Sequence, residues 1–416
     1  MNLVTPAEHP FAQFVRALGK GKRGARNLTR EEAREAMGML LDGKVEDTQL
    51  GAFLMLLRHK EESAEEMAGF AEAVRARLQA PAIQVDLDWP SYAGKKRHLP
   101  WFLLAAKALA SSGVRILLHG GGPHTAGRMY SEQLLATLHI PLCRNWGSVE
   151  QALAQQQLAF IPLGDWMPQL QRMIDLRNIL GLRSPIHSLA RILNPLGARC
   201  GLQSIFHPGY QAVHREASQL LGDSAVVIKG EGGEIEINPD ATSHLYGTAN
   251  GDNWDEEWPA LSALRHVKPE SLQPAHLAAF WRGEVADDYG QLAVISTMAL
   301  ALRALGEPRE QALERAAHMW AARQQTHAGL KGVELAAIGD VDVLHPLVGF
   351  RQVRLAFAHQ RLVAEHGAAL GHGALHFEAD LRSWRTTLGI AELVDARQRQ
   401  VSGVGWQCLM RRTGGE

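Results

Sequence analysis

The chain has 416 residues, of which 46% are hydrophobic, a length and composition typical of two globular domains or of one domain with an extension. Its three cysteines, Cys143, Cys200 and Cys408, lie far apart, which excludes a disulfide framework and any familiar metal-ligand spacing. The amino terminus does not resemble a signal peptide, and no apolar run is long enough to span a membrane. These features predict a cytoplasmic protein without membrane contact.

The net charge of −1 conceals two oppositely charged blocks. Residues 89–215 contain 13 basic and 4 acidic residues, whereas residues 216–325 contain 8 basic and 17 acidic residues. A basic block of this size predicts a surface that faces a polyanion, provided that its side chains converge. The alternative is that the basic block docks onto the acidic one.

Residues 1–82 predict a small helical domain, which part of residues 165–195 completes. Thr29 begins the sequence T-R-E-E and Ser63 begins S-A-E-E, and both patterns are typical of a capping box at a helix start. Leucine, methionine, alanine and phenylalanine recur at helical spacing after each start. The predicted helices span residues 9–18, 29–43, 48–59 and 63–78.

Residues 83–325 predict an α/β domain with a largely parallel sheet, because short apolar runs alternate with helical stretches. The predicted strands span residues 115–118, 159–162, 225–228 and 235–237. The predicted helices span residues 102–110, 131–138, 167–180, 214–221, 290–305 and 306–325. The polar stretch 254–269 predicts a loop, and residues 326–416 form an extension whose role the sequence does not indicate.

One glycine-rich turn stands out within this domain. An apolar run from Val114 to Leu118 is followed by His119 and three glycines, Gly120 to Gly122. Such a turn after a buried strand often brings backbone amides close to a ligand, commonly a phosphate. A plain strand-to-helix turn explains the glycines equally well.

Two stretches resemble a known family. The segment L-T-R-E-E-A from Leu28, continued by Q-L-G-A-F-L-M-L-L-R-H-K, resembles the amino-terminal helical domain of the anthranilate phosphoribosyltransferases. The segment R-N-I-L-G-L-R-S-P-I-H-S-L-A-R-I-L-N-P, residues 177–195, resembles that family's second motif. The resemblance spans about residues 11–325. It implies the nucleoside phosphorylase/phosphoribosyltransferase-like fold of glycosyltransferase family 3, which is an α/β domain with a small all-α domain.

The residues that the family uses for chemistry are largely replaced. The family's phosphate loop G-T-G-G-D falls on residues 93–97, where one glycine is kept and the acidic residue is lost. The acidic pair that holds Mg²⁺ in the family falls on residues 235 and 236. The resemblance therefore implies no catalytic residue, no metal site and no cofactor. The matching ligand-site positions are Gly94, His119, Gly120, Gly121, Arg177 and Glu236.

These departures resemble the YbiB-type branch of the family, which implies a homodimer that binds nucleic acid without sequence preference. Phosphates would be bound by a basic groove, and we expect single-stranded DNA or RNA as the partner. The sequence predicts these phosphate-binding residues: Lys20, Lys22, Arg23, Lys95, Lys96, Arg97, Arg128 and Arg183. Replacement of residues 95–97 by glutamate is expected to abolish binding with an unchanged fold. Tyr92 and Trp101 either stack on bases or belong to the core.

Two other functions remain open from the sequence. A phosphoribosyltransferase with an altered phosphoribosyl diphosphate site would use His119, Arg177 and Glu236, with Glu234 and Glu236 holding one Mg²⁺. A scaffold for another protein would instead use the acidic block 216–325 as its contact surface.

Overall fold

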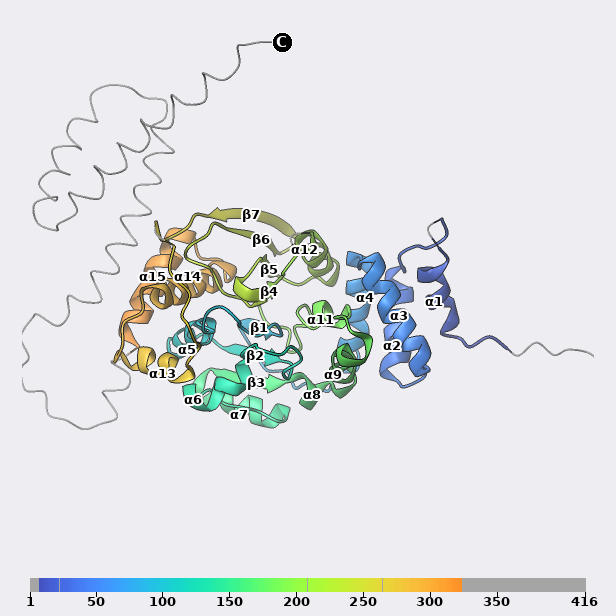
Figure 1. Ribbon diagram of the computed structural model, residues 1–416, viewed down its shortest axis with the longest axis horizontal. Helices are drawn as coiled ribbons and strands as arrows, with labels where there is room; N and C mark the ends of the chain where they lie inside the picture. The colour runs from blue at the N-terminus through green and yellow to red at the C-terminus, as the bar shows by residue number, and fades with distance from the viewer. Residues whose placement is uncertain (1–6, 22, 208, 264, 324–416) are drawn as a thin grey trace, which may run out of the picture. The chain divides into compact units, whose positions relative to one another are not determined.

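The computed structural model describes residues 7–21, 23–207, 209–263 and 265–323, so the predicted extension 326–416 and Lys22 lie outside the described residues. A helical domain forms the first part of the chain (Figure 1). Thr29 and Ser63 form the predicted capping boxes with Glu32 and Glu66. The helices are α1 (Ala12–Gly19), α2 (Arg30–Leu41), α3 (Asp47–Lys60) and α4 (Ala64–Arg75).

The second part is built on a seven-stranded sheet with the order β3-β2-β1-β4-β5-β6-β7. The first five strands pair in parallel, which confirms the predicted α/β fold with a small all-α domain. The strands are β1 (Leu87–Ser91), β2 (Ile116–Gly120), β3 (Leu158–Pro162), β4 (Cys200–Ser204), β5 (Ala225–Ile228), β6 (Ser243–Ala249) and β7 (Asp252–Trp258).

Two predictions about the sheet are wrong. Residues 235–237 were predicted as a strand, but they lie in the irregular segment between β5 and β6. Part of the predicted loop 254–269 is strand β7, which pairs antiparallel with β6. The acidic sequence D-N-W-D-E-E-W has no apolar alternation because β7 is an edge strand whose side chains are mostly exposed.

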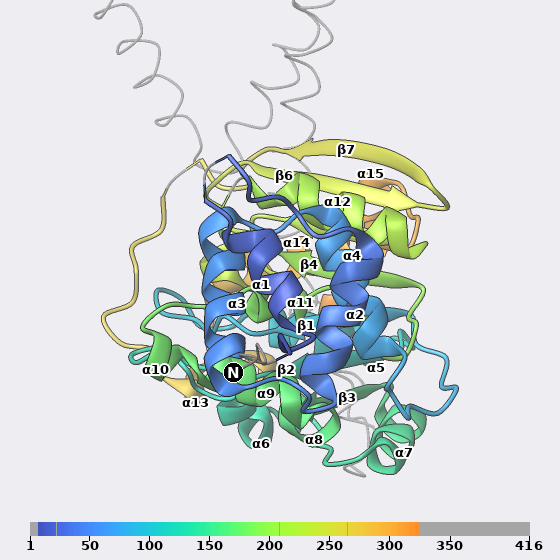
Figure 2. The same ribbon diagram turned by 90° about the vertical axis from the view of Figure 1, so that its right-hand side faces the viewer.

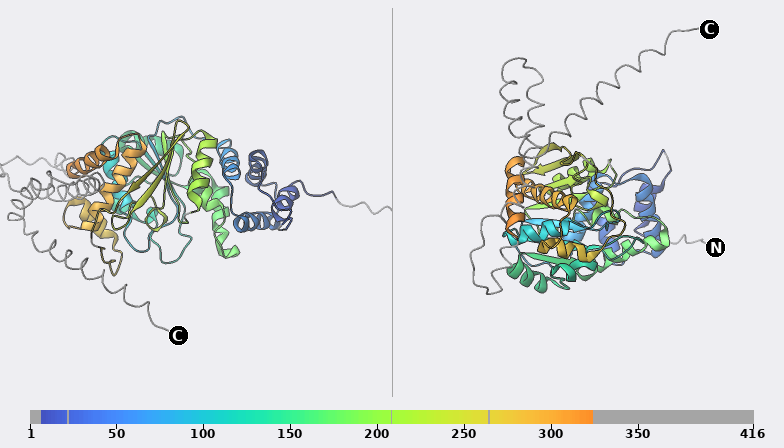
Figure 3. Two further views of the ribbon diagram at one scale, coloured as in Figure 1. Left: turned by 90° about the horizontal axis from the view of Figure 1, so that it is seen from above. Right: turned by 60° about the vertical axis from the view of Figure 1, so that its left-hand side comes forward.

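Helices cover the sheet in two groups, which lie on opposite sides of the strands in Figures 1 and 3. One group contains α5 (Phe102–Ser111), α13 (Pro274–Arg282), α14 (Asp288–Ala304) and α15 (Arg309–Ala322). The other contains α8 (Leu163–Trp166), α9 (Pro168–Asp175), α10 (Arg177–Leu180), α11 (Ile186–Leu189) and α12 (Tyr210–Leu221), beside α4 of the helical domain (Figure 2). Two further helices, α6 (Leu135–Leu138) and α7 (Trp146–Gln156), lie between β2 and β3 in the chain.

The strand order creates one preferred place for a ligand. The chain moves from β1 to β2 and β3 in one direction, returns to the other side of β1, and then adds β4 and β5. In parallel sheets, the crevice at such a switch lies outside the carboxyl ends of the two central strands. Here those ends are Ser91 of β1 and Ser204 of β4. Among the described helices, none is long and apolar enough to cross a membrane.

Candidate functional site

The loop after β1 is occupied by a carboxylate of the protein itself. The backbone amides of Ala93 and Gly94 donate hydrogen bonds to Oε1 of Glu234, at 2.8 and 2.6 Å. Gly94 adopts a φ of +66°, which a residue with a side chain rarely adopts. Glu234 is buried, and burial raises the pKa of its carboxyl group. The amides of this loop are therefore already occupied by the carboxyl group of Glu234.

Lys95 and Glu236 form a buried ion pair beside that loop. Nζ of Lys95 lies 2.6 Å from Oε1 of Glu236 and also donates to the carbonyl of Glu231. The amide of Phe102, at the start of α5, donates to the other oxygen of Glu236 at 2.9 Å. Burial raises the pKa of Glu236 to about 7 although Lys95 favours the carboxylate. We call residues 93–95 with Glu234 and Glu236 the closed loop.

The structure separates the three basic residues that were predicted to act together. Lys95 is 1% exposed, whereas Lys96 and Arg97 are exposed. The side chain of Lys95 is therefore not placed to contact a phosphate, unlike those of Lys96 and Arg97. A glutamate at position 95 would lie beside Glu236 in the interior of the protein. We therefore no longer expect the variant with glutamate at residues 95–97 to keep an unchanged fold.

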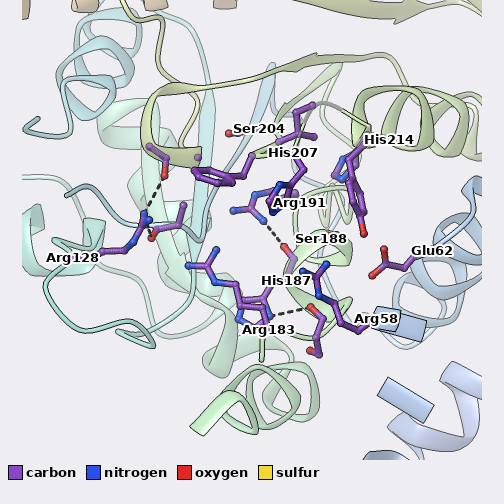
Figure 4. Close-up of a pocket in the computed structure, with 17 residues that line it drawn as sticks. Arg58, Glu62, Arg128, Arg183, His187, Ser188, Arg191, Ser204, His207 and His214 are labelled. Carbon is purple, nitrogen blue, oxygen red and sulfur yellow. Dashed lines mark hydrogen bonds between the residues drawn. The ribbon is translucent and has the colours of Figure 1, made fainter. Parts of the chain in front are cut away.

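Four arginines line a cavity of about 290 Å³ at the carboxyl ends of β1 and β4 (Figure 4). Arg183 and Arg191 come from the segment around α11, and Arg128 comes from the loop after β2. Arg58 and the acidic Glu62 come from the helical domain, from the end of α3 and the loop after it. We call this space the arginine cavity.

Arginines outnumber acidic residues in the described lining of the arginine cavity, although Glu234 interacts with Arg191 from outside the lining. Among the described residues that line it, Glu62 is the acidic one, and burial raises the pKa of its carboxyl group. Burial and the neighbouring Arg191 and Arg128 lower the pKa of Arg183 to about 10, so its guanidinium stays charged at neutral pH. Burial likewise lowers the pKa of Arg191. An anion in the cavity would relieve this mutual repulsion.

Two buried histidines of the cavity, His187 and His214, add no positive charge at neutral pH. Burial, together with His124 and the arginines, lowers the pKa of His187 to about 2. Burial lowers the pKa of His214 to about 3. Both imidazoles are therefore neutral groups that accept or donate hydrogen bonds.

Arg128 forms a wall between the arginine cavity and a second hollow. Its guanidinium donates hydrogen bonds to the carbonyls of Ala93, Gly94 and Gly232, at 3.2, 2.9 and 3.1 Å. The second hollow, of about 510 Å³, is lined by Arg128, Lys96 and the acidic Glu270 together with uncharged residues. We call it the Lys96 hollow. The two spaces share Arg128, so cationic side chains continue from one into the other.

The other predicted ligand-site residues serve the fold. His119 is fully buried, with Nδ1 2.8 Å from the hydroxyl of Tyr92 and Nε2 3.1 Å from the carboxylate of Asp88. A Cβ atom at Gly120 would lie 2.5 Å from the carbonyl oxygen of Ser91, so this glycine permits close packing of β1 and β2. Gly121 similarly packs against the ring of Tyr92.

Arg177 lies near the arginine cavity without lining it. Its guanidinium donates a hydrogen bond to the carbonyl of His124 and contributes to the low pKa of Arg183. Lys20 and Arg23 are exposed on the loop after α1, the described helix that lies farthest from the sheet in Figures 1 and 3. The structure therefore does not bring these two residues to the cavity.

Tyr92 and Trp101 belong to the core. Of the two predicted alternatives, stacking on bases or a place in the core, the structure shows the second. Tyr92 is 1% exposed and Trp101 is 3% exposed. Trp101 packs edge-to-face on Phe280, and a Cβ atom at Gly290 would overlap its ring. Neither ring is available for a base.

The two carboxylates that the family resemblance assigns to Mg²⁺ do not fit a metal site in this structure. Oε1 of Glu234 accepts from two amides, while Glu236 accepts from an ammonium group and an amide. Three of the four carboxylate oxygens thus face N–H donors, and Oε2 of Glu234, which has no hydrogen-bond partner among the described residues, is by itself too few ligands for a hard cation. Within the described ranges, no three His, Cys, Asp or Glu side chains form a group that would hold a metal.

Several residues of the arginine cavity were not predicted as site residues, among them Arg58, Arg191 and Phe206. Arg191 follows Arg183 by eight residues, but Pro185 lies between them and interrupts the helical spacing that would place both on one face. Arg58 belongs to the helical domain, so only the packing of α4 against α11 and α12 brings it close. Phe206 follows β4, a strand that was not predicted.

Comparisons with known proteins agree with this architecture. Residues 12–78 match the model described as "Glycosyl transferase family, helical bundle domain". The protein YbiB of Escherichia coli (strain K12), described as uncharacterized, is 30% identical over 235 residues, which are 55% of this chain and 73% of that protein. The anthranilate phosphoribosyltransferase of Brevibacillus brevis is 30% identical over 54% of this chain and 67% of its own length. The chain belongs to the anthranilate phosphoribosyltransferase-like family.

Solved structures show that this family member has the family's fold. The anthranilate phosphoribosyltransferase of Thermus thermophilus superposes with a TM-score of 0.62 and 22% identity, covering 83% of this chain and 99% of that chain. The enzyme of Saccharomyces cerevisiae in complex with PRPP and Mg superposes with a TM-score of 0.61 and 16% identity, covering 84% of this chain and 99% of that one. These matches extend across the helical domain and the α/β domain.

Proposed function

We propose that this chain binds single-stranded DNA or RNA without sequence preference and does not transfer a phosphoribosyl group. The observation that carries this proposal is the charge of the arginine cavity, whose described lining includes four guanidinium groups and one carboxyl group, that of Glu62, while Glu234 interacts with Arg191 from outside the lining. Guanidinium groups recognise phosphate oxygens through paired hydrogen bonds. Contacts to phosphates provide affinity that does not depend on the base sequence.

The Lys96 hollow supports a ligand that carries several phosphates. Lys96 and Arg128 continue the positive charge beyond the arginine cavity, and Arg97 is exposed next to Lys96. A single phosphorylated metabolite would be held by one cavity. A chain of phosphates explains why basic side chains line both hollows.

The closed loop supports the absence of phosphoribosyl transfer. Expulsion of diphosphate requires donors and a cation that stabilise the charge of the leaving group. At the corresponding positions, the amides of Ala93 and Gly94 hold Glu234, and Lys95 neutralises Glu236. No group of the closed loop is left to bind a diphosphate without breaking one of these contacts.

We also propose that the chain acts as a homodimer, as the resemblance of its helical domain to the family implies. Two copies would present two cationic surfaces and so hold a longer strand than one copy does. Sedimentation equilibrium measures the mass of the assembly directly.

The test is fluorescence anisotropy of labelled single strands of two unrelated sequences, titrated with the full chain at about 50 and 200 mM salt. We expect equal affinities for the two sequences and a steep loss of affinity at the higher salt. The variant Arg183→Gln should lower the affinity about tenfold, because it removes one charge-assisted phosphate contact. It should also reduce the slope of log affinity against log salt by about 0.7.

The matched control is Arg172→Gln, which removes an exposed arginine that pairs with Asp47 outside the arginine cavity. Its affinity should equal that of the unchanged protein. If the unchanged protein binds no strand at low salt, the proposal is wrong. Calorimetry with phosphoribosyl diphosphate and Mg²⁺ then tests the alternative, an altered phosphoribosyltransferase, which is the natural second candidate because the yeast enzyme with the same fold forms a complex with PRPP and Mg.

A further inference from the structure

Phe206 lies exposed at the arginine cavity. Its side chain is 58% exposed, although it follows directly after the buried Ile205 at the end of β4. The ring packs edge-to-face on His207, with centroids 5.1 Å apart and planes at 84°. Phe206 also lines the cavity together with the four arginines. Burial in the core therefore does not explain this residue, and its position beside cationic groups needs another explanation.

The cavity also holds buried polar atoms that lack a hydrogen-bond partner among the described residues. Three of these atoms are Oγ of Ser184, Oγ of Ser204 and Nε2 of His187. All three residues line the cavity, and each is at least nine-tenths buried. A buried polar group without a partner is unfavourable unless a ligand or water completes its hydrogen bonds. The cavity is thus equipped with neutral hydrogen-bonding groups as well as with guanidinium groups.

The size of the cavity limits what these groups can hold. A volume of about 290 Å³ accepts a small group such as a phosphate with its sugar, but not a double helix. In a duplex, moreover, the bases are stacked inside and cannot lie on a protein ring. In a single strand, a base next to a bound phosphate is free to stack on an aromatic side chain.

We propose that the arginine cavity holds one nucleotide unit of a single strand, with its phosphate among the arginines and its base stacked on Phe206. This inference rests on the proposed function and makes Phe206 the residue that selects single strands over duplexes. Arginines alone would bind the phosphates of both forms. The ring adds a contact that only an unpaired base can make.

The experiment compares the full chain with its Phe206→Ala variant on three probes: a single strand, the matching duplex, and the same strand built from abasic units. We expect the variant to bind the single strand about tenfold more weakly. Its affinities for the duplex and for the abasic strand should change less than twofold. Phe206→Trp should restore the affinity for the single strand, because indole offers an equally large ring.

The matched control is Ile179→Ala, which truncates another exposed large apolar side chain, 80% exposed and outside the cavity. This control should leave all three affinities unchanged. Equal weakening of all three probes by Phe206→Ala would show a structural role and overturn the inference. An unchanged affinity for the single strand would overturn it as well. Both results leave the proposed function standing, which fails only if the unchanged protein binds no nucleic acid.

Discussion

The closed loop and the arginine cavity are neighbours that differ in how their charges are balanced. In the closed loop, Lys95 is paired with Glu236, and Glu234 is held by two amides. In the arginine cavity, the described lining includes four guanidinium groups and one acidic residue, and Glu234 interacts with Arg191 from outside the lining. Ala93 touches both, since its amide binds Glu234 and its side chain lines the cavity. The comparison indicates that a basic side chain attracts an external polyanion only when the protein itself does not already pair it with an acidic group. The number of basic residues alone does not predict the binding site.

The largest effect that tests this comparison is on stability. Replacing Lys95 by methionine leaves the buried carboxylate of Glu236 without its cation, so we expect the free energy of unfolding to fall by about 3–5 kcal/mol. The affinity of the folded protein for a single strand should stay unchanged. Chemical denaturation measures the stability, and anisotropy measures the affinity.

The neighbouring residue supplies the control for that prediction. Lys96 is exposed and lines the Lys96 hollow, so Lys96→Met should change the stability by less than about 0.5 kcal/mol. It should instead weaken the binding of a single strand. If Lys95→Met lowers the affinity and Lys96→Met does not, the assignment of the two lysines is reversed.

A smaller effect is expected from anions that occupy the arginine cavity. Inorganic diphosphate at ten times its dissociation constant should stabilise the fold by about 1.4 kcal/mol, because it binds the folded chain alone. Differential scanning calorimetry should then show a rise in Tm of about 3 °C. Sodium chloride at equal ionic strength serves as the control. A rise of the same size in Arg183→Gln would place the anion outside the cavity.

The smallest effect is expected from pH. The low pKa values of His187 and His214, about 2 and 3, keep both rings neutral down to about pH 4. The pKa of Arg183, about 10, keeps its guanidinium group protonated at neutral pH. Protonation of these two histidines would strengthen phosphate binding, but only below about pH 4. We therefore expect the affinity for a single strand to change less than twofold between pH 6 and 8 in titrations at constant ionic strength. Tighter binding at pH 6 than at pH 8 would contradict this.

The sequence predicted the helical domain well, because the capping boxes at Thr29 and Ser63 and the apolar periodicity are local signals. Strands β2, β3 and β5 were also predicted, since they are short apolar runs. Strand β1 was missed because its sequence L-D-W-P-S contains a charge and a proline. The buried Asp88 that breaks the pattern is compensated by His119 from the next strand, which no local rule reveals.

The candidate site was predictable only in part. Arg128 and Arg183 were selected from the sequence, and both line the arginine cavity. Arg58 was missed because it reaches the cavity through the packing of the helical domain on the sheet. Lys95 and Lys96 are adjacent and chemically identical, and their difference depends on Glu236, which is 140 residues away along the chain from Lys96.

The contact between Glu234 and the loop amides also has a thermodynamic meaning. Glu234 is a tethered carboxylate, so Ala93 and Gly94 meet it at an effective concentration of millimolar or higher. Any phosphate that approaches these amides from solution competes with a ligand that never diffuses away. The loop amides are thus occupied by an intramolecular ligand, and we expect external anions to bind instead at the guanidinium groups of the arginine cavity.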